Sequence, residues 1–268
     1  MTISSDQNAW NKHCETYDRD SKDFVEKATT TMFHVLRNAV EEFKVEEAWG
    51  IPTKMHAQMK VLDFGAGTGN LAVPLLERLC GEVTAVDVSK GMLEYARKKM
   101  EAKKLEDRFR IINAEITAEN VKAGVENDIK KDSDRCLYVE KEGYDMVLCS
   151  MVIHHMPDMV AAIKMFKSML KPNGLLFIYE FEATDNAKAG ALKDKKKSHG
   201  VFHAGLTPST FMELMQAAGL KTLHSKVLPS RSRLHVYNSH TNWICPFDVW
   251  KPAKRRLVLS AYTRTCLG

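Results

Sequence analysis

Residues 61–69 read Val-Leu-Asp-Phe-Gly-Ala-Gly-Thr-Gly, and this stretch indicates the fold of the whole chain. The apolar run at residues 60–64 leads into three glycines with alternate spacing, Gly65, Gly67 and Gly69. Leucines at helical spacing follow over residues 71–79. Because glycine lacks a Cβ, such a loop can turn tightly and bring its backbone close to a ligand. The stretch predicts a buried strand, a ligand-binding loop and a helix, in that order.

The glycine pattern by itself leaves more than one class of cofactor-binding fold open. Dinucleotide-binding folds carry G-x-G-x-x-G at this place. Here the sixth position of that motif is Asn70, and the third glycine, Gly69, comes one residue early. The strands that follow must therefore decide between the classes.

The following sequence alternates strands and helices. Short apolar runs predict strands at 82–86, 109–112, 144–149 and 175–181. Helices are predicted from the N-cap Ser89 to about Lys104, and over Pro157–Leu170. A further helix over 209–218 precedes two final strands, 221–228 and 233–237. Alternating strands and helices indicate an α/β fold with a parallel sheet and right-handed crossovers.

Three segments flank or interrupt this pattern. Residues 1–59 have a helical apolar face and are predicted as an N-terminal helical lid or substrate segment. The polar stretch 117–143 reads as a surface insertion into the domain that spans 60–238. Residues 239–268 have no clear period and are predicted as a basic, aromatic C-terminal tail.

The composition is that of an ordinary globular protein. The chain has 268 residues, 44% of them hydrophobic, which fits one large or two small domains and excludes a disordered chain. Its six cysteines form no close pair, which favours free thiols in a reducing compartment. Neither a signal segment nor a run of about 18 apolar residues is visible, so we expect a cytoplasmic protein without membrane contact.

The formal net charge of +5 is unevenly distributed. Residues 1–59 carry −3, residues 60–180 carry −1, and residues 181–268 carry +9. The excess of positive charge therefore lies outside the predicted cofactor-binding half. A charge this mild does not by itself indicate nucleic acid, which usually leaves a stronger basic footprint.

Chemically informative side chains follow each predicted strand. Asp87 ends the second strand, where a carboxylate can accept hydrogen bonds from both ribose hydroxyls of an adenosine. Glu115 and Ile116 follow the third strand and could meet the edge and the face of an adenine ring. Residues 149–156, Cys-Ser-Met-Val-Ile-His-His-Met, follow the fourth. Because ligands of open α/β sheets bind at the carboxyl ends of strands, these features predict one site.

The blocks VLDFGAGTGN, VTAVDVS, YDMVLCSMVIHHM and LKPNGLLFI, in this order, resemble the class I S-adenosylmethionine-dependent methyltransferases. The small-molecule enzymes of the type 11/12 kind are the most similar, over about residues 10–237. The resemblance implies a Rossmann-like, doubly wound sheet of seven strands, mostly parallel with an antiparallel last strand and helices on both faces. It implies S-adenosyl-L-methionine as the cofactor. The chain departs from the family pattern at Ala114-Glu115, where Gly-Asp is usual, and in the long insertion.

Carried over residue by residue, the resemblance gives each position a role. The methionine part of the cofactor would lie among Asp63, Gly65, Ala66, Gly67 and Gly69, with Ser150 and Met151 bordering the sulfonium. Asp87 would bind the ribose, and the adenine would lie among Val88, Met92, Glu115 and Ile116. The N-terminal segment resembles the family's lid, in which Tyr17 would close over the cofactor and Trp10 is a candidate for substrate contact.

A base is needed only if the acceptor carries a proton at pH 7, and His154 and His155 are the candidates. Either could instead be a histidine that only orients the loop. His199 and His203 are further candidates for substrate contact. Their i,i+4 spacing is compatible with metal ligands, but the intervening Gly200 and the lack of a nearby third ligand disfavour a metal site.

The leading hypothesis is methylation of a small molecule at O, N, S or C by a monomer or homodimer. Signatures of the adenine or glutamine amino-group, cytosine-C5 and arsenite enzymes are not found in the sequence. The basic last third keeps an RNA or protein methyltransferase as an alternative, although nucleic acid is disfavoured as a partner. A non-catalytic cofactor-binding module that acts through its tail is the second alternative.

Overall fold

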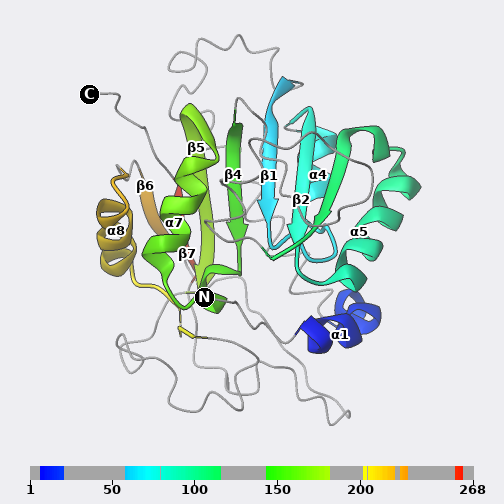
Figure 1. Ribbon diagram of the computed structural model, residues 1–268, viewed down its shortest axis with the longest axis horizontal. Coiled ribbons are helices and arrows are strands. Elements are labelled where there is room, and N and C mark those ends of the chain that lie inside the picture. The colour runs from blue at the N-terminus through cyan, green and yellow to red at the C-terminus, as the bar shows by residue number, and fades with distance from the viewer. Residues whose placement is uncertain are drawn as a thin grey trace.

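The computed structural model describes residues 7–20, 58–78, 80–115, 143–181, 202–203, 205–220, 224–228 and 257–261. These residues form one sheet with helices on both of its faces (Figure 1). Several predictions lie outside the described residues: the helix beyond residue 20, the insertion from 117 to 142, the strand 233–237, and the side chains of Ile116 and His199. No helix in the described part of the chain has the length and apolar character needed to cross a membrane.

The sheet contains seven strands in the order β3-β2-β1-β4-β5-β7-β6. Strands β1 to β5 run parallel, whereas β7 is antiparallel to both of its neighbours. Their bounds are β1 Lys60–Phe64, β2 Glu82–Asp87, β3 Phe109–Asn113, β4 Tyr144–Ser150, β5 Leu170–Phe181, β6 His224–Leu228 and β7 Leu257–Ala261. The expected mostly parallel sheet with an antiparallel last strand is therefore confirmed.

The origin of the last strand differs from the prediction. The strand between β5 and β6 is Leu257–Ala261, which belongs to the segment predicted as a tail. On one side it pairs with β5, where Phe177 lies opposite Ala261 and Phe181 opposite Leu257. On its other side it pairs with β6. The assignment of 239–268 as an appendage is thus wrong for these five residues. A short apolar run from any part of the chain can occupy an open position in a sheet. The local sequence pattern therefore could not show that residues 257–261 take this one.

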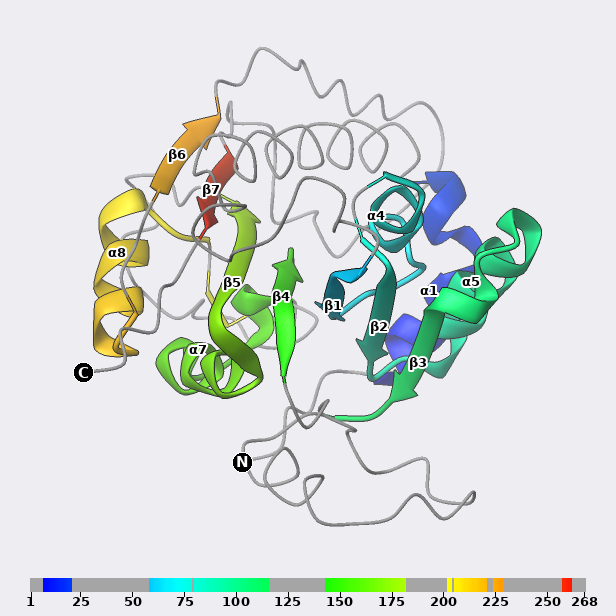
Figure 2. The same cartoon turned by 90° about the horizontal axis from the view of Figure 1, so that it is seen from above.

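Helices cover both faces of the sheet (Figure 2). Helices α4 (Ala72–Arg78) and α5 (Lys90–Lys103) contribute Leu75, Leu76, Leu93 and Met100 to the core on one face. Helices α7 (Met159–Ser168) and α8 (Pro208–Ala217) bury Ile163, Phe166, Phe211 and Met215 on the other. Burial of large apolar side chains on both faces explains why the strands read as continuous apolar runs.

Side-chain caps fix where two central helices begin. Ser89 accepts a hydrogen bond from the backbone N–H of Met92 and starts α5, as predicted. Helix α7 begins later than predicted, because Asp158 caps it by accepting from the N–H of Ala161 and Pro157 lies outside. Helix α1 (Gln7–Asp20) lies below the carboxyl ends of β1 and β2, next to α5 (Figure 1).

Candidate active site

The glycine loop turns at the carboxyl end of β1. The N–H groups of Gly65 and Ala66 both donate to the carbonyl of Val86 on β2, at 2.8 and 3.1 Å. Gly65 has φ +72°, and a Cβ there would lie 2.3 Å from a methyl carbon of Val152. At Gly67, with φ +53°, a Cβ would meet nothing within 4 Å. The loop therefore needs glycine at 65 for space and at 67 for its backbone conformation.

Asp87 fastens this loop to the end of β2. Its Oδ2 accepts from the N–H of Gly67 and its Oδ1 from the N–H of Ser89, each at 2.8 Å. Burial raises the pKa of the Asp87 carboxyl, and the backbone N–H groups of Ser89, Gly67 and Val88 oppose that shift. A carboxylate has about four acceptor positions, so these bonds leave capacity for a ligand hydroxyl.

Asp63 lies on β1 just before the loop and is 2% exposed. Burial, together with the nearby charge of Asp87, raises the pKa of the Asp63 carboxyl to about 7. Its Oδ2 meets no hydrogen-bond donor from the described residues. Buried carboxyl oxygens are normally paired, so Asp63 Oδ2 is an exception among the described residues.

Helix α1 is held over the loop by two polar side chains. Asp18 accepts from Thr68 Oγ1 at 2.6 Å and forms an ion pair with Lys99 of α5 at 2.5 Å. Asn11 Oδ1 accepts from Ser89 Oγ at 2.9 Å and from the N–H of Gly91 at 3.0 Å. These bonds join residues far apart in sequence, so the helix closes over the glycine loop and the start of α5.

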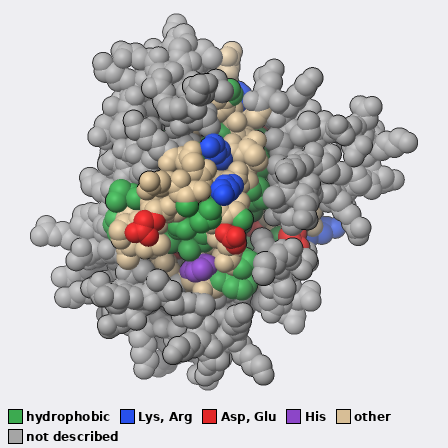
Figure 3. Space-filling view, turned by 60° about the vertical axis from the view of Figure 1, so that its left-hand side comes forward, with side chains coloured by type: hydrophobic (Ala, Val, Ile, Leu, Met, Phe, Trp, Pro, Cys, Tyr) green, Lys and Arg blue, Asp and Glu red, His purple; other side chains and the backbone are tan. Residues whose placement is uncertain are grey.

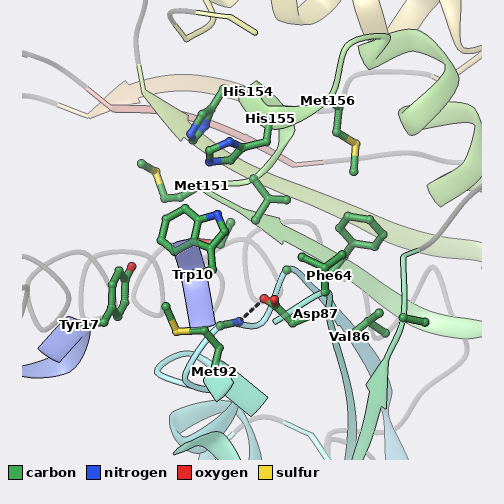
Figure 4. Close-up of a pocket in the computed structure, with 16 residues that line it drawn as sticks. Trp10, Tyr17, Phe64, Val86, Asp87, Met92, Met151, His154, His155 and Met156 are labelled. Atoms are coloured by element: carbon green, nitrogen blue, oxygen red, sulfur yellow. Dashed lines mark hydrogen bonds between the residues drawn. The ribbon is translucent and has the colours of Figure 1, made fainter. Parts of the chain in front are cut away.

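A cavity of about 180 Å³ lies between α1 and the carboxyl ends of the strands (Figure 4). Its walls are mostly apolar and aromatic. The residues that line it are Trp10, Tyr17, Phe64, Gly65, Gly67, Val86, Asp87, Val88, Met92, Ala114, Ser150, Met151, Val152, His154, His155 and Met156.

Aromatic side chains from α1 form one wall of the cavity. The rings of Trp10 and Tyr17 meet edge to face with centroids 6.3 Å apart, and Trp10 meets His155 in the same way at 6.0 Å. Met151 borders them with φ +59°, a conformation costly for residues other than glycine and typical of functional sites. Its N–H donates to the carbonyl of Tyr179 at 2.8 Å, which holds the turn after β4 in place.

His154 is the best-supported ionisable side chain in the cavity wall. Its Nδ1 lies 2.8 Å from Oε2 of Glu180 on β5, and the two residues are 4% and 1% exposed. The N–H groups of Phe202 and His203 donate to its carbonyl, at 2.9 and 3.2 Å. The structure thus fixes His154 from the strand side and from the segment that follows β5.

Most of the predicted site residues that are described come together here. Eleven of them line the cavity: Trp10, Tyr17, Gly65, Gly67, Asp87, Val88, Met92, Ser150, Met151, His154 and His155. Asp63, Ala66, Gly69, Glu115 and His203 are not among the lining residues. Gly69 instead packs against α5, where a Cβ would lie 3.0 Å from that of Ala96. His203 adjoins the backbone of His154 but not the cavity.

Sequence reasoning missed two kinds of functional position. The apolar lining residues at strand ends were not predicted: Phe64, Val86, Ala114, Val152 and Met156. The anchors Asn11 and Asp18 and the partner Glu180 were also missed. A signal for Glu180 existed, because it is an acid inside the apolar strand run LLFIYEF. The described residues contain no group of three or more His, Cys, Asp or Glu side chains placed to hold a metal ion.

The fold is a class I cofactor-binding α/β fold. It is defined by the order of the strands, by the glycine loop after β1 and by the acid Asp87 at the end of β2. A sequence model of the family described as "Methyltransferase domain" matches residues 30–225. The chain belongs to this family, the class I S-adenosylmethionine-dependent methyltransferases.

Two curated relatives agree with this assignment. An uncharacterized methyltransferase, C1347.09 of Schizosaccharomyces pombe, is 30% identical over 166 residues, which are 60% of this chain and 53% of that protein. A ubiquinone biosynthesis O-methyltransferase of Dinoroseobacter shibae is 28% identical over 63% of this chain and 62% of that protein. The matched region thus spans less than two thirds of the length of either relative.

Among solved structures, the magnesium protoporphyrin IX methyltransferase of Synechocystis with bound SAH superposes with a TM-score of 0.59. The match covers 98% of this chain and 99% of that one at 13% identity, so it supports the fold alone.

Proposed function

We propose that the protein transfers a methyl group from S-adenosylmethionine to a small-molecule acceptor. The observation that carries the proposal is the cavity at the carboxyl ends of β1, β2 and β4, with the Asp87 carboxylate and the glycine loop in its wall. This is where ligands bind in open α/β sheets. Family membership supports the choice of cofactor.

The side chains present fit that cofactor. Asp87 has acceptor capacity for a ribose hydroxyl, and Val88 and Met92 offer apolar contact to a flat ring. The open space above Gly67 permits close approach of a ligand to the backbone. Asp63, on β1 just before the loop, is not among the lining residues, and its buried Oδ2 has no donor among the described residues. When bound, S-adenosylmethionine supplies an already activated methyl group, so the protein mainly has to align the acceptor and exclude water.

The enclosure of the cavity favours a small acceptor. Trp10 and Tyr17 of α1 cover it, and the described residues that line it include no Lys or Arg. On the face shown in Figure 3, acidic and basic side chains of the described residues are intermixed around hydrophobic ones. Neither feature favours a nucleic-acid substrate, which needs an extended basic surface. The similarity to an O-methyltransferase supports oxygen as the accepting atom.

Isothermal titration with S-adenosylmethionine tests the proposal directly. We expect binding to the wild-type protein, and at least tenfold weaker binding to Asp87→Ala because charge-assisted hydrogen bonds are lost. Asp107→Ala, on the exposed turn Glu106–Arg108, is the matched control. Absence of binding to a folded wild-type protein would refute the proposal, and tRNA binding that falls steeply with salt would redirect it to nucleic acid.

We further propose the cytoplasm as the compartment. Cys14, Cys80 and Cys149 are buried and free, as expected for a protein of a reducing environment. Burial raises the pKa of Cys80 to about 12 and that of Cys149 well above its ordinary value, so neither thiol is reactive. Recovery of the protein in an organelle or extracellular fraction after cell fractionation would contradict this proposal.

A further inference from the structure

We infer that the acceptor of the proposed reaction is an uncharged molecule with an apolar ring, and that Trp10 is the residue that selects it. The inference rests on the proposed methyl transfer and adds to it the class of acceptor and a specificity-determining residue. It begins from the walls of the cavity away from the glycine loop, which are mostly apolar or aromatic.

The cavity has two ends with different side chains (Figure 4). Asp87 and Met92 lie at one end, which the proposed function assigns to the ribose and adenine of the cofactor. The turn after β4 lies at the other end, with the side chains of His154, His155 and Met156. We call this second end the acceptor end, because an acceptor must approach from it when the first end is filled.

Apolar side chains that are fixed by the core form the walls near the acceptor end. Met156 is 3% exposed and shares a hydrophobic core cluster with Phe64. The ring of Phe64 meets that of Phe166 on α7 edge to face, with centroids 4.8 Å apart. Val152 packs so closely on the glycine loop that a Cβ on Gly65 would lie 2.3 Å from one of its methyl carbons. The walls are therefore preorganised, and contact with an apolar ligand costs them little ordering.

Trp10 borders the acceptor end from helix α1. Its ring meets that of His155 edge to face, with centroids 6.0 Å apart. The next residue, Asn11, accepts hydrogen bonds from Ser89 and Gly91, which fasten the helix to the start of α5. Aromatic rings gain energy from edge-to-face and offset-stacked partners beyond the burial of their area. A ring-containing acceptor therefore gains a contact with Trp10 that an open chain lacks.

The described residues that line the cavity supply no counter-charge for a charged acceptor. They include neither Lys nor Arg. Their one carboxylate, Asp87, lies at the opposite end and accepts from the N–H groups of Gly67 and Ser89. His154 faces Glu180 at 2.8 Å, so a proton on its ring would be balanced within that pair. A charged group at the acceptor end would lose its water without gaining a partner, which is strongly unfavourable.

Methionine methyl NMR tests the acceptor class without turnover. Protein with ¹³C-labelled methionine methyl groups is loaded with S-adenosylhomocysteine at pH 8, where an ordinary imidazole is neutral. It is titrated with three probes of similar shape: benzyl alcohol, benzoate and benzylammonium. We expect benzyl alcohol to shift the signal of Met156 and to bind at least about tenfold more tightly than either ion. Equal or tighter binding of an ion, or a Met156 signal that benzyl alcohol leaves unmoved, would overturn the inference.

Variants and a fourth probe test the selection of a ring. Met156→Leu assigns the Met156 signal, and Met212→Leu, at a position of α8 that is 49% exposed, should leave both the signal and the affinity unchanged. Trp10→Ala should weaken binding of benzyl alcohol by about fivefold or more, whereas Trp10→Phe should restore most of the affinity. Hexanol, an open chain, should bind wild-type protein several-fold more weakly. Wild-type affinity in Trp10→Ala would overturn the role of Trp10, and equal binding of hexanol would overturn the preference for a ring.

Turnover keeps this inference distinct from the proposed function. With isotope-labelled S-adenosylmethionine and a small-molecule cell extract, we expect labelled products whose unmethylated parents contain a ring and are uncharged at pH 7. Trp10→Ala should raise the KM for such an acceptor more than it lowers kcat, because a binding contact is lost. Wild-type protein that binds no cofactor, or transfers no label, refutes the proposed function. Label found only on acids, phosphates or ammonium compounds overturns the acceptor class and leaves the proposed function standing.

Discussion

Asp63→Asn should make the stability of the cofactor-free protein less sensitive to pH. The carboxyl has an ordinary pKa of 3.8 and a pKa of about 7 in the folded protein, where it is 2% exposed. Between these values the folded state holds one more proton than the unfolded state, so stability falls as pH rises. In the Asp63→Asn variant the neutral amide does not titrate, so this dependence of stability on pH is lost.

The size of the effect follows from the two pKa values. At 1.36 kcal/mol per pKa unit, ionising Asp63 costs the folded state about 4 kcal/mol above pH 7. Between pH 5 and pH 8, wild-type stability relative to Asp63→Asn should therefore fall by about 2.5 kcal/mol. At pH 8 the variant should be the more stable protein. The gain should be smaller than the full cost of ionising Asp63, because the buried amide of the variant also lacks a partner, a penalty of about 1–3 kcal/mol.

Urea denaturation of both proteins at pH 5 and pH 8, followed by tryptophan fluorescence, measures this difference. Asp107→Asn, on the exposed turn, controls for the loss of one surface carboxylate. A stability difference that is equal at the two pH values would refute the reasoning, because it would mean that Asp63 is hydrated in the folded protein.

Three further substitutions test the loop and its lid. Gly65→Ala should destabilise the protein by about 2 kcal/mol or more and abolish cofactor binding in calorimetry, because its Cβ would lie 2.3 Å from Val152. Gly67→Ala should cost only about 1–2 kcal/mol of backbone strain in urea denaturation, since its Cβ meets nothing, and an effect as large as that at Gly65 would contradict the open cavity. Asp18→Ala should raise hydrogen exchange in α1 and weaken cofactor binding several-fold, because the bond from Thr68 and the ion pair with Lys99 are lost, and unchanged exchange would mean that other contacts hold the lid.

The sequence by itself determined the features that arise within one stretch of chain. Strand β1, the glycine loop and helix α4 follow each other directly, so apolar spacing and the positive-φ glycines specify them locally. The cap Ser89 lies three residues from its partner Met92. Asp87 could be placed because carboxyl ends of parallel strands meet at one edge of the sheet.

Only the tertiary structure decided the contacts between distant segments. His154 and Glu180 lie 26 residues apart, and Asp18 and Thr68 lie 50 apart. Strand β7 enters the sheet from beyond residue 250. Periodicity describes which face of an element is apolar, but it carries no information on which element that face meets. The contact of His154 with a carboxylate therefore needed the fold, because Glu180 is supplied by the neighbouring strand β5.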